Sequence, residues 1–215
     1  MLFLLGKKNK ILREVLVCIL DYGSGNVKSV SNLIAFLGYN VNISNKIEDI
    51  ESSTHIILPG VGAFGSAMKR INSKIPVSEL ANEVIKKKKP FLGICVGMQV
   101  LLEKGYEYGE HIGLGWFPGS VNKINTKNQP SLHIGWNNII TKRNSILFNG
   151  LGDINDFYFV HSYAVSTDEQ FENAYTEYGN KFCSSIQKDN IYGVQFHPEK
   201  SQKAGQKLIH NFLSI

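Results

Sequence analysis

The stretch "PFLGICVGMQ", residues 90–99, places a cysteine between two glycines where an apolar run ends and an amphipathic segment begins. The pattern Gly93-Ile94-Cys95-Val96-Gly97 has the form of a nucleophile elbow with cysteine in place of serine. The glycines let neighbouring backbone approach closely, while the strand-to-helix turn lifts the sulfur to the carboxyl end of a sheet. The turn also places the thiol at a helix N-terminus, which favours the thiolate. We therefore predict that Cys95 is a nucleophile and that the Val96 amide faces a developing oxyanion.

Upstream of this turn, strand-like and helix-like segments alternate. The segment "EVLVCILDY" (14–22) is a continuous apolar run, which is typical of a strand buried on both faces. Apolar residues at helical spacing follow it, and Gly38 supplies a C-cap. This alternation predicts a parallel sheet with helices on both faces. The expected strands are 14–22, 40–44, 54–60 and 90–94, and the expected helices are 27–39, 63–71 onward and 78–89.

The pattern changes after about Gly113, where short strands are separated by Asn, Gly and Asp turns. We expect strands in "SVNKIN", "NNIIT", "DFYFVHSYAVS", "NAYTEY", "FCSSIQ" and "IYGVQFHP", and a final helix in "SQKAGQKLIHNFLSI". The predicted fold class is α/β, with a mostly parallel central sheet flanked by helices and an adjoining antiparallel portion. We assign residues 15–215 to one domain and residues 1–14 to an N-terminal extension.

Composition excludes several classes of function. At 215 residues, with 43% hydrophobic and 19% charged residues, the chain reads as globular. Three scattered cysteines are too few for a disulfide scaffold or a zinc cluster, which favours a reducing cytoplasm. The net charge of +5 forms no basic stripe, since the only lysine run, 86–89, suits a solvated helix terminus, so we expect no nucleic-acid partner. No segment is long enough to span a membrane.

The glycine-containing loop "GSGN" after the first strand does not predict a dinucleotide site. It supplies Gly23 and Gly25, but Lys28 stands where the third glycine of the fingerprint belongs. We therefore expect no cofactor and no metal.

A thiol nucleophile needs a base, and the base needs an orienting group. His197 stands in "GVQFHPEKS" just past a buried strand, and Glu199 follows two positions later. His197 is thus the candidate base and Glu199 the group that fixes its tautomer. The glycine-rich loop "LPGVGAFG" (58–65) follows another strand, so Val61 or Gly62 is the candidate for a second oxyanion-hole amide.

The motifs around Cys95, Val61 and His197 together resemble those of a known family. The motifs "GICVGMQ", "PGVGAFG" and "QFHPEKS" are similar to those of the class I glutamine amidotransferases, whose Cys-His-Glu triad releases ammonia from glutamine. Together with "LDYGSGNVKSV", "LHIGWNN" and "YFVHSYAV", they resemble the glutaminase subunits of imidazole glycerol phosphate synthases over nearly the whole chain from Val15.

The resemblance implies roles for further residues. It implies that Cys95 attacks the glutamine carboxamide, that His197 passes a proton to departing ammonia, and that the Val61 peptide must reorient before it serves the oxyanion. It places Gln99, Glu107 and the His161-Ser162-Tyr163 backbone at the bound glutamine. It places Asn26, Trp136 and Lys200 at the interface with a (β/α)₈-barrel synthase subunit. In that heterodimer the ammonia would enter histidine biosynthesis.

Three alternatives stay open at the level of sequence. Leu132 and Ser24 depart from the family's usual residues, which leaves room for a paralogue that supplies ammonia to another synthase, such as one amidating a surface sugar. A cysteine peptidase or γ-glutamyl hydrolase on a similar sheet is the second. A non-catalytic regulator is the third, and the presence of Cys95, His197 and Glu199 together argues against it.

Overall fold

Strand β4 (Phe91–Cys95), which ends at the elbow cysteine, lies near the middle of the main sheet. The computed structural model describes residues 15–23, 26–153 and 155–215; the N-terminal extension 1–14, together with Ser24 and Gly25, lies outside the described residues. Within them, the sheet has the order β2-β1-β3-β4-β14-β13-β11-β7-β5-β6. Strands β3 (His55–Gly60) and β4 are buried at every position, as expected for continuous apolar runs between two layers of helices.

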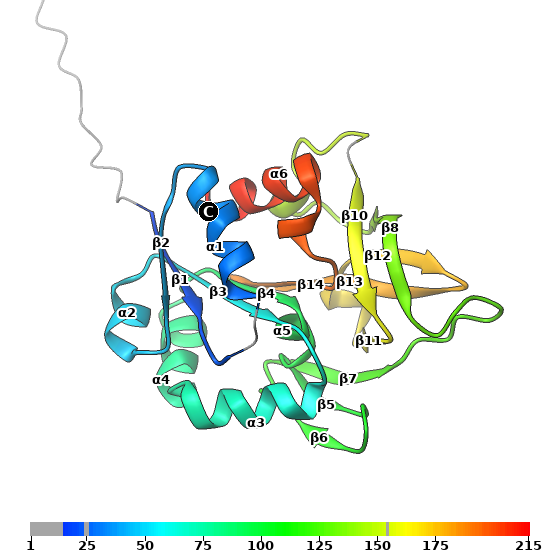
Figure 1. The fold of residues 1–215 in the computed structure, drawn as a ribbon, viewed down its shortest axis with the longest axis horizontal. Coiled ribbons are helices and arrows are strands. Elements are labelled where there is room, and N and C mark those ends of the chain that lie inside the picture. The colour runs from blue at the N-terminus through cyan, green and yellow to red at the C-terminus, as the bar shows by residue number, and fades with distance from the viewer. Residues whose placement is uncertain (1–14, 24–25, 154) are drawn as a thin grey trace, which may run out of the picture.

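The first half of the sheet is parallel. Strand β1 (Leu16–Leu20) pairs in parallel with β2 (Asn40–Ser44) and β3, and β3 pairs in parallel with β4. Figure 1 shows α1 (Val27–Phe36) and α6 (Gln202–Phe212) on one side of these strands, and α3 (Phe64–Lys74) and α4 (Val77–Ala81) on the other. The α/β prediction is therefore confirmed. No helix within the described parts of the chain is long and apolar enough to cross a membrane.

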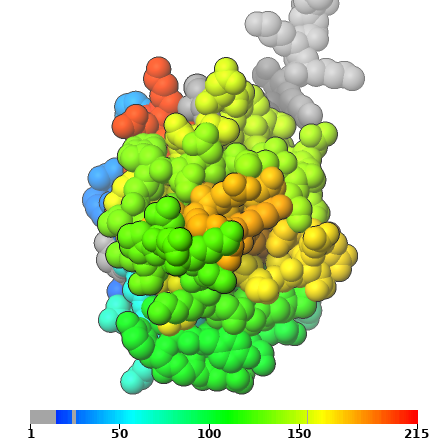
Figure 2. Space-filling view, turned by 90° about the vertical axis from the view of Figure 1, so that its right-hand side faces the viewer, coloured from blue at the N-terminus to red at the C-terminus, as the bar shows by residue number. Residues whose placement is uncertain are grey.

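Strand β14 (Ile191–Val194) joins the two halves of the sheet. It is parallel to β4 on one side and antiparallel to β13 (Asn180–Lys188) on the other. Beyond β13 the pairing is mostly antiparallel, as predicted. Figure 2 views this end of the molecule, and the chain near the start of β13 (orange) is visible at its surface. The remaining strands of this sheet are β5 (Leu102–Gly105), β6 (His111–Ile112), β7 (Phe117–Lys123), β9 (Ile140–Thr141), β11 (Tyr163–Ser166) and β12 (Glu172–Tyr178).

Strands β8 (His133–Asn138) and β10 (Asp156–His161) form a separate two-stranded sheet. The prediction of one strand over "DFYFVHSYAVS" was therefore wrong, because the chain leaves β10 at His161 and enters the main sheet as β11 at Tyr163. The Ser162 carbonyl between them accepts a hydrogen bond from the Ile124 amide at 2.9 Å. The predicted strand "NNIIT" likewise covers the end of β8 and all of β9.

The predicted helix 78–89 is also interrupted. Helix α4 ends at Ala81 and a π-helical turn, η1 (Asn82–Lys86), follows it. This turn contains the buried Glu83, whose carboxylate forms ion pairs with Lys87 and, at 3.1 Å, with Lys89. Part of the lysine run thus folds back on a buried acid, and not all of it is solvated as predicted. The short helix α2 (Ile47–Ser52) was not predicted.

Candidate active site

Cys95 occupies a strained turn between β4 and the short helix α5 (Val96–Gln99). Its backbone has φ 55° and ψ −113°, in the region that favours glycine, at a cost on the order of 1–3 kcal/mol. The flanking glycines make the turn possible. A Cβ on Gly97 would lie 1.8 Å from the Leu58 carbonyl oxygen, and a Cβ on Gly93 would lie 2.5 Å from the Gly97 oxygen. The local geometry is therefore that of a nucleophile elbow.

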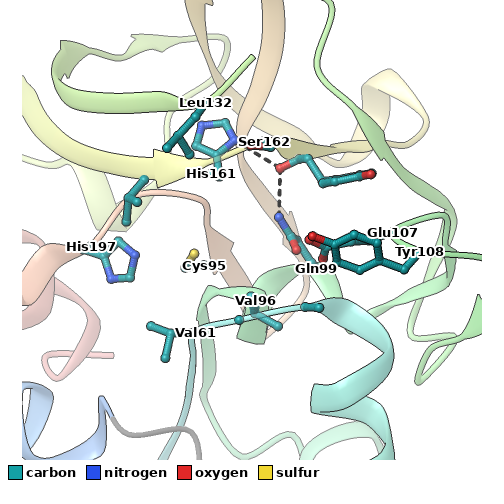
Figure 3. A pocket seen from close by; sticks show the side chains of 14 residues that line it. Val61, Cys95, Val96, Gln99, Glu107, Tyr108, Leu132, His161, Ser162 and His197 are labelled. Carbon is teal, nitrogen blue, oxygen red and sulfur yellow. Dashed lines mark hydrogen bonds between the residues drawn. The ribbon is translucent and has the colours of Figure 1, made fainter. Parts of the chain in front are cut away.

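His197 and Glu199 lie side by side with fully buried side chains. His197 Nδ1 donates to Glu199 Oε1 at 2.8 Å, which leaves Nε2 for the cysteine side, and η4 (Pro198–Lys200) carries the glutamate. Nε2 has no hydrogen-bond partner among the described residues, and Figure 3 shows the His197 ring and the Cys95 sulfur facing the same pocket. Burial by itself lowers the pKa of His197, but the Cys95 and Glu199 side chains raise it to about 10. The Cys95 and Glu199 side chains thus favour the imidazolium form of His197.

Cys95 and His197 open into a pocket of about 360 Å³. Val61 and Gly62 reach it because β3 pairs with β4 so that Gly60 lies opposite Cys95. Its walls include every residue that we predicted for the oxyanion hole and for glutamine binding (Figure 3): Val61, Gly62, Val96, Gln99, Glu107, His161, Ser162 and Tyr163. The structure thus brings these residues together, whereas their individual roles stay predictions.

Two of the candidate glutamine-binding side chains are held in place by backbone groups. Gln99 donates through Nε2 to the Tyr163 carbonyl at 2.9 Å. Glu107 accepts a hydrogen bond from the Phe64 amide at 3.0 Å, at the first residue of α3. A carboxylate is favourable at a helix N-terminus, so Glu107 is fixed at the edge of the pocket.

Comparisons with known proteins agree with this geometry. The family model described as glutamine amidotransferase class-I matches residues 18–215. The chain belongs to this family. This amidotransferase is 44% identical over 199 residues to imidazole glycerol phosphate synthase subunit HisH 2 of Vibrio vulnificus, covering 92% of this chain and 93% of the relative. It is 46% identical over 196 residues to subunit HisH of Aquifex aeolicus, covering 90% and 94%. The recognition of the family from its motifs is confirmed.

Solved structures show that the fold is shared more widely. The amidotransferase superposes on the structure of PurLQS from Thermotoga maritima with a TM-score of 0.72 at 16% identity, covering 94% of this chain and 98% of that chain. A crystal structure titled as a glutamine amidotransferase matches with a TM-score of 0.69 at 19% identity, covering 92% and 97%. At such identities the likeness establishes the fold alone.

The three residues predicted at the partner interface differ in position. Asn26 is buried, and its Nδ2 donates at 3.0 Å to the same Glu199 oxygen that binds His197. In the amidotransferase it therefore contacts the Glu199 carboxylate directly. Trp136 is 48% exposed and lies edge-on to Tyr158, while Lys200 Nζ lies 5.4 Å from the Tyr158 ring centre. Trp136 and Lys200 thus share one aromatic neighbour.

Five residues that line the pocket or contact the sulfur were not predicted to do so from the sequence. Ala63, Tyr108, Leu132 and Val160 complete the pocket wall, and the buried Gln195 contacts Cys95. A signal for Gln195 was available. In extended chain, residues two apart point to the same side, so Gln195 and His197 in "GVQFHPE" are expected to face the same way.

Two buried histidines beside the pocket predict acid sensitivity. Burial lowers the pKa of His133 to about 4 and, with the nearby His133, that of His161 to about 3. In the unfolded chain both histidines have pKa values near 6.5, so below that pH the unfolded state binds more protons than the folded state. The contribution of these two histidines to the free energy of unfolding is therefore complete above pH 6.5 and is lost as the pH falls toward 3. We expect a loss of about 1–2 kcal/mol per histidine between pH 6.5 and 5. Urea titrations at the two pH values test this, and equal unfolding free energies would contradict it.

Proposed function

We propose that this chain is the glutaminase subunit of an imidazole glycerol phosphate synthase, which hydrolyses L-glutamine to glutamate and ammonia. The observation that carries the proposal is the meeting of the strained Cys95 and of His197, which is hydrogen-bonded to the buried Glu199, at one pocket of about 360 Å³. A pocket of this size admits a small amide such as glutamine. The relatives named as HisH subunits support the choice of synthase.

The residues divide the reaction as follows. In the resting site the Cys95 proton is already held by His197 Nε2, and the resulting thiolate attacks the carboxamide carbon to form a tetrahedral intermediate. Amides of Val96 and of Val61 or Gly62 stabilise its oxyanion. His197 then gives its proton to the departing ammonia, and a water molecule, deprotonated by His197, hydrolyses the γ-glutamyl thioester. Glu199 holds His197 in one tautomer throughout.

Substrate recognition falls to the opposite wall of the pocket. The Glu107 carboxylate suits the α-ammonium group of glutamine, while Gln99 and the 161–163 backbone suit the rest of the amino acid. This chain would need no cofactor and no metal for this chemistry, since acyl transfer by a thiol needs only a base and an oxyanion hole.

The ammonia must be consumed elsewhere, since the site described here holds only the glutamine half of the reaction. We propose a heterodimer with a (β/α)₈-barrel synthase subunit in the cytoplasm, bound near Trp136 and Lys200. The partner would combine ammonia with a ribulosyl phosphate and release imidazole glycerol phosphate and an aminoimidazole carboxamide ribotide.

The direct test mixes the purified chain with the barrel synthase subunit from the same genome and measures glutamate release. We expect the barrel subunit to raise turnover at least about tenfold, because an oxyanion hole completed only in the complex is worth several kcal/mol. Stimulation by a different ammonia-consuming synthase, and not by this barrel, would assign the chain to another pathway. Peptide cleavage without glutamine hydrolysis would contradict the proposed chemistry itself.

The Trp136→Ala variant locates the partner on this face of the molecule. The half-exposed ring packs on Tyr158, whose carbonyl oxygen accepts the His197 amide at 2.9 Å, so its loss should weaken stimulation more than folding. The matched control is Phe36→Ala, which removes another exposed aromatic ring, on α1. Undiminished stimulation of Trp136→Ala would place the interface elsewhere.

A further inference from the structure

The Cys95 sulfur has a hydrogen-bond donor that belongs neither to the triad nor to the oxyanion hole. Gln195 Nε2 lies 3.6 Å from Cys95 Sγ, with N–H···S geometry that qualifies as a hydrogen bond. Gln195 is fully buried and follows the last residue of β14, so its position is fixed by the strand beside β4. The sulfur is therefore contacted by a buried side chain that does not line the pocket.

The amide of Gln195 has one orientation only, because a carbonyl oxygen fixes it. The Tyr163 carbonyl can only accept, so the Gln99 atom 2.9 Å from it must be the nitrogen. The same Gln99 nitrogen also lies 3.0 Å from the end of the Gln195 side chain. Because its second proton needs an acceptor, the Gln195 atom at that position must be the oxygen, Oε1. The Gln195 NH₂ group therefore points to the sulfur. A flip of either amide would bring two donors or two acceptors together.

The carbonyl that fixes this orientation is itself held by a buried histidine pair. His161 Nδ1 donates to the Tyr163 oxygen at 3.0 Å, and His161 Nε2 pairs with His133 Nδ1 at 3.1 Å. Donation from Nδ1 makes His161 Nε2 an acceptor, so His133 must donate to it. The side chains of Gln99, Gln195, His161 and His133 are all at least nine-tenths buried, and every hydrogen bond in the series pairs a donor with an acceptor. Such a series resists reorientation because every alternative leaves a buried donor or acceptor unpaired.

We infer that Gln195 is a further catalytic residue, which stabilises the Cys95 thiolate by donating a hydrogen bond to its sulfur. The inference rests on the proposed role of Cys95 as the nucleophile. With the thiol proton held by His197 Nε2, the negative charge remains on the sulfur and strengthens this bond, since charge-assisted hydrogen bonds are about twice as strong as neutral ones. Gln195 neither gains nor loses a proton. It acts on the reactive state of the sulfur before glutamine arrives.

The test is alkylation of the full-length chain by iodoacetamide at pH 7 without glutamine or partner, followed on the Cys95 peptide by mass spectrometry. Burial raises the pKa of Cys18 to about 12 and that of Cys183 further, so these thiols react slowly. Gln195→Met keeps the length of the side chain and removes the donor. We expect the Cys95 rate to fall roughly 10- to 100-fold, as for loss of a hydrogen bond to a charged group, and its pH profile to move to higher pH.

Two further variants separate donation from packing. Gln195→Glu keeps an acceptor for Gln99 but offers no donor once its buried carboxyl is ionised, so above the pKa of that carboxyl its alkylation rate should fall at least as far as that of Gln195→Met. Gln187→Met is the matched control, because Gln187 bonds Ser145 and Asn173 in a separate polar cluster. It should lower stability and leave Cys95 alkylation unchanged.

The inference is overturned if Gln195→Met folds and alkylates at the wild-type rate, or if Gln195→Glu alkylates at that rate at a pH where its carboxyl is ionised. Should Gln195→Met not fold, Gln195→Glu decides, since it retains the bond to Gln99. The glutaminase proposal fails separately, because a wild-type chain that alkylates rapidly but never hydrolyses glutamine contradicts only that proposal.

Discussion

Replacing Cys95 by alanine is expected to lower glutamine hydrolysis by about 10⁵-fold, close to the uncatalysed rate, because no other group can form the acyl intermediate. The other two thiols, Cys18 and Cys183, are buried within strands away from the pocket. Glutamate release in the presence of the barrel subunit measures the effect. Because φ 55° is equally unfavourable for cysteine and for alanine at position 95, the substitution should neither add nor remove backbone strain. The Cys95→Ala variant should therefore keep the fold.

The matched control for this variant is Cys18→Ala, which removes a buried thiol from β1 and should leave turnover unchanged apart from lost stability. Partner binding by Cys95→Ala should equal that of the wild type. Turnover above a hundredth of the wild-type rate would show that a different side chain is the nucleophile.

Replacing His197 by glutamine should lower turnover by about 10⁴-fold, because glutamine can neither accept the thiol proton nor give one to ammonia. The raised pKa of His197, about 10, results from burial opposed by the more favourable interactions with Cys95 and Glu199. Loss of the imidazolium also removes the positive charge beside the sulfur. Alkylation of Cys95 at pH 7 should therefore fall together with turnover.

His210→Gln provides the control for this substitution, since it changes an exposed histidine on α6 whose ring hydrogen-bonds Tyr39. A His197→Gln variant with lost turnover and unchanged alkylation would restrict the histidine to protonation of ammonia. Retention of both would remove it from the mechanism.

Local sequence patterns predicted the parts of the site that lie on single elements. The glycines around Cys95 specify the elbow because any side chain at Gly97 would collide with Leu58. The short spacing of His197 and Glu199 places both on one turn after β14. Apolar runs likewise located the buried strands β1, β3 and β4.

Contacts between distant segments could not be predicted in this way. The bond between Asn26 and Glu199 joins residues 173 positions apart, and no local pattern announces it. The break at Ser162 follows from the geometry of two different sheets, whereas residues 156–166 taken alone have the composition of one long strand. The π-helical turn after α4 carries Glu83, whose carboxylate pairs with Lys89 beyond the turn, and the helical spacing of residues 78–89 does not indicate this interruption.

The position of β14 has a consequence for biosynthesis. This last strand of the described chain fills the gap between β4 and β13, so the middle of the sheet is completed after its flanks. A nascent polypeptide that has left the ribosome only as far as residue 188 presents two unpaired strand edges, which are prone to association with other chains. His197, the proposed base, emerges about a hundred residues after Cys95, so the proposed thiol–imidazole pair forms only once this strand has been made.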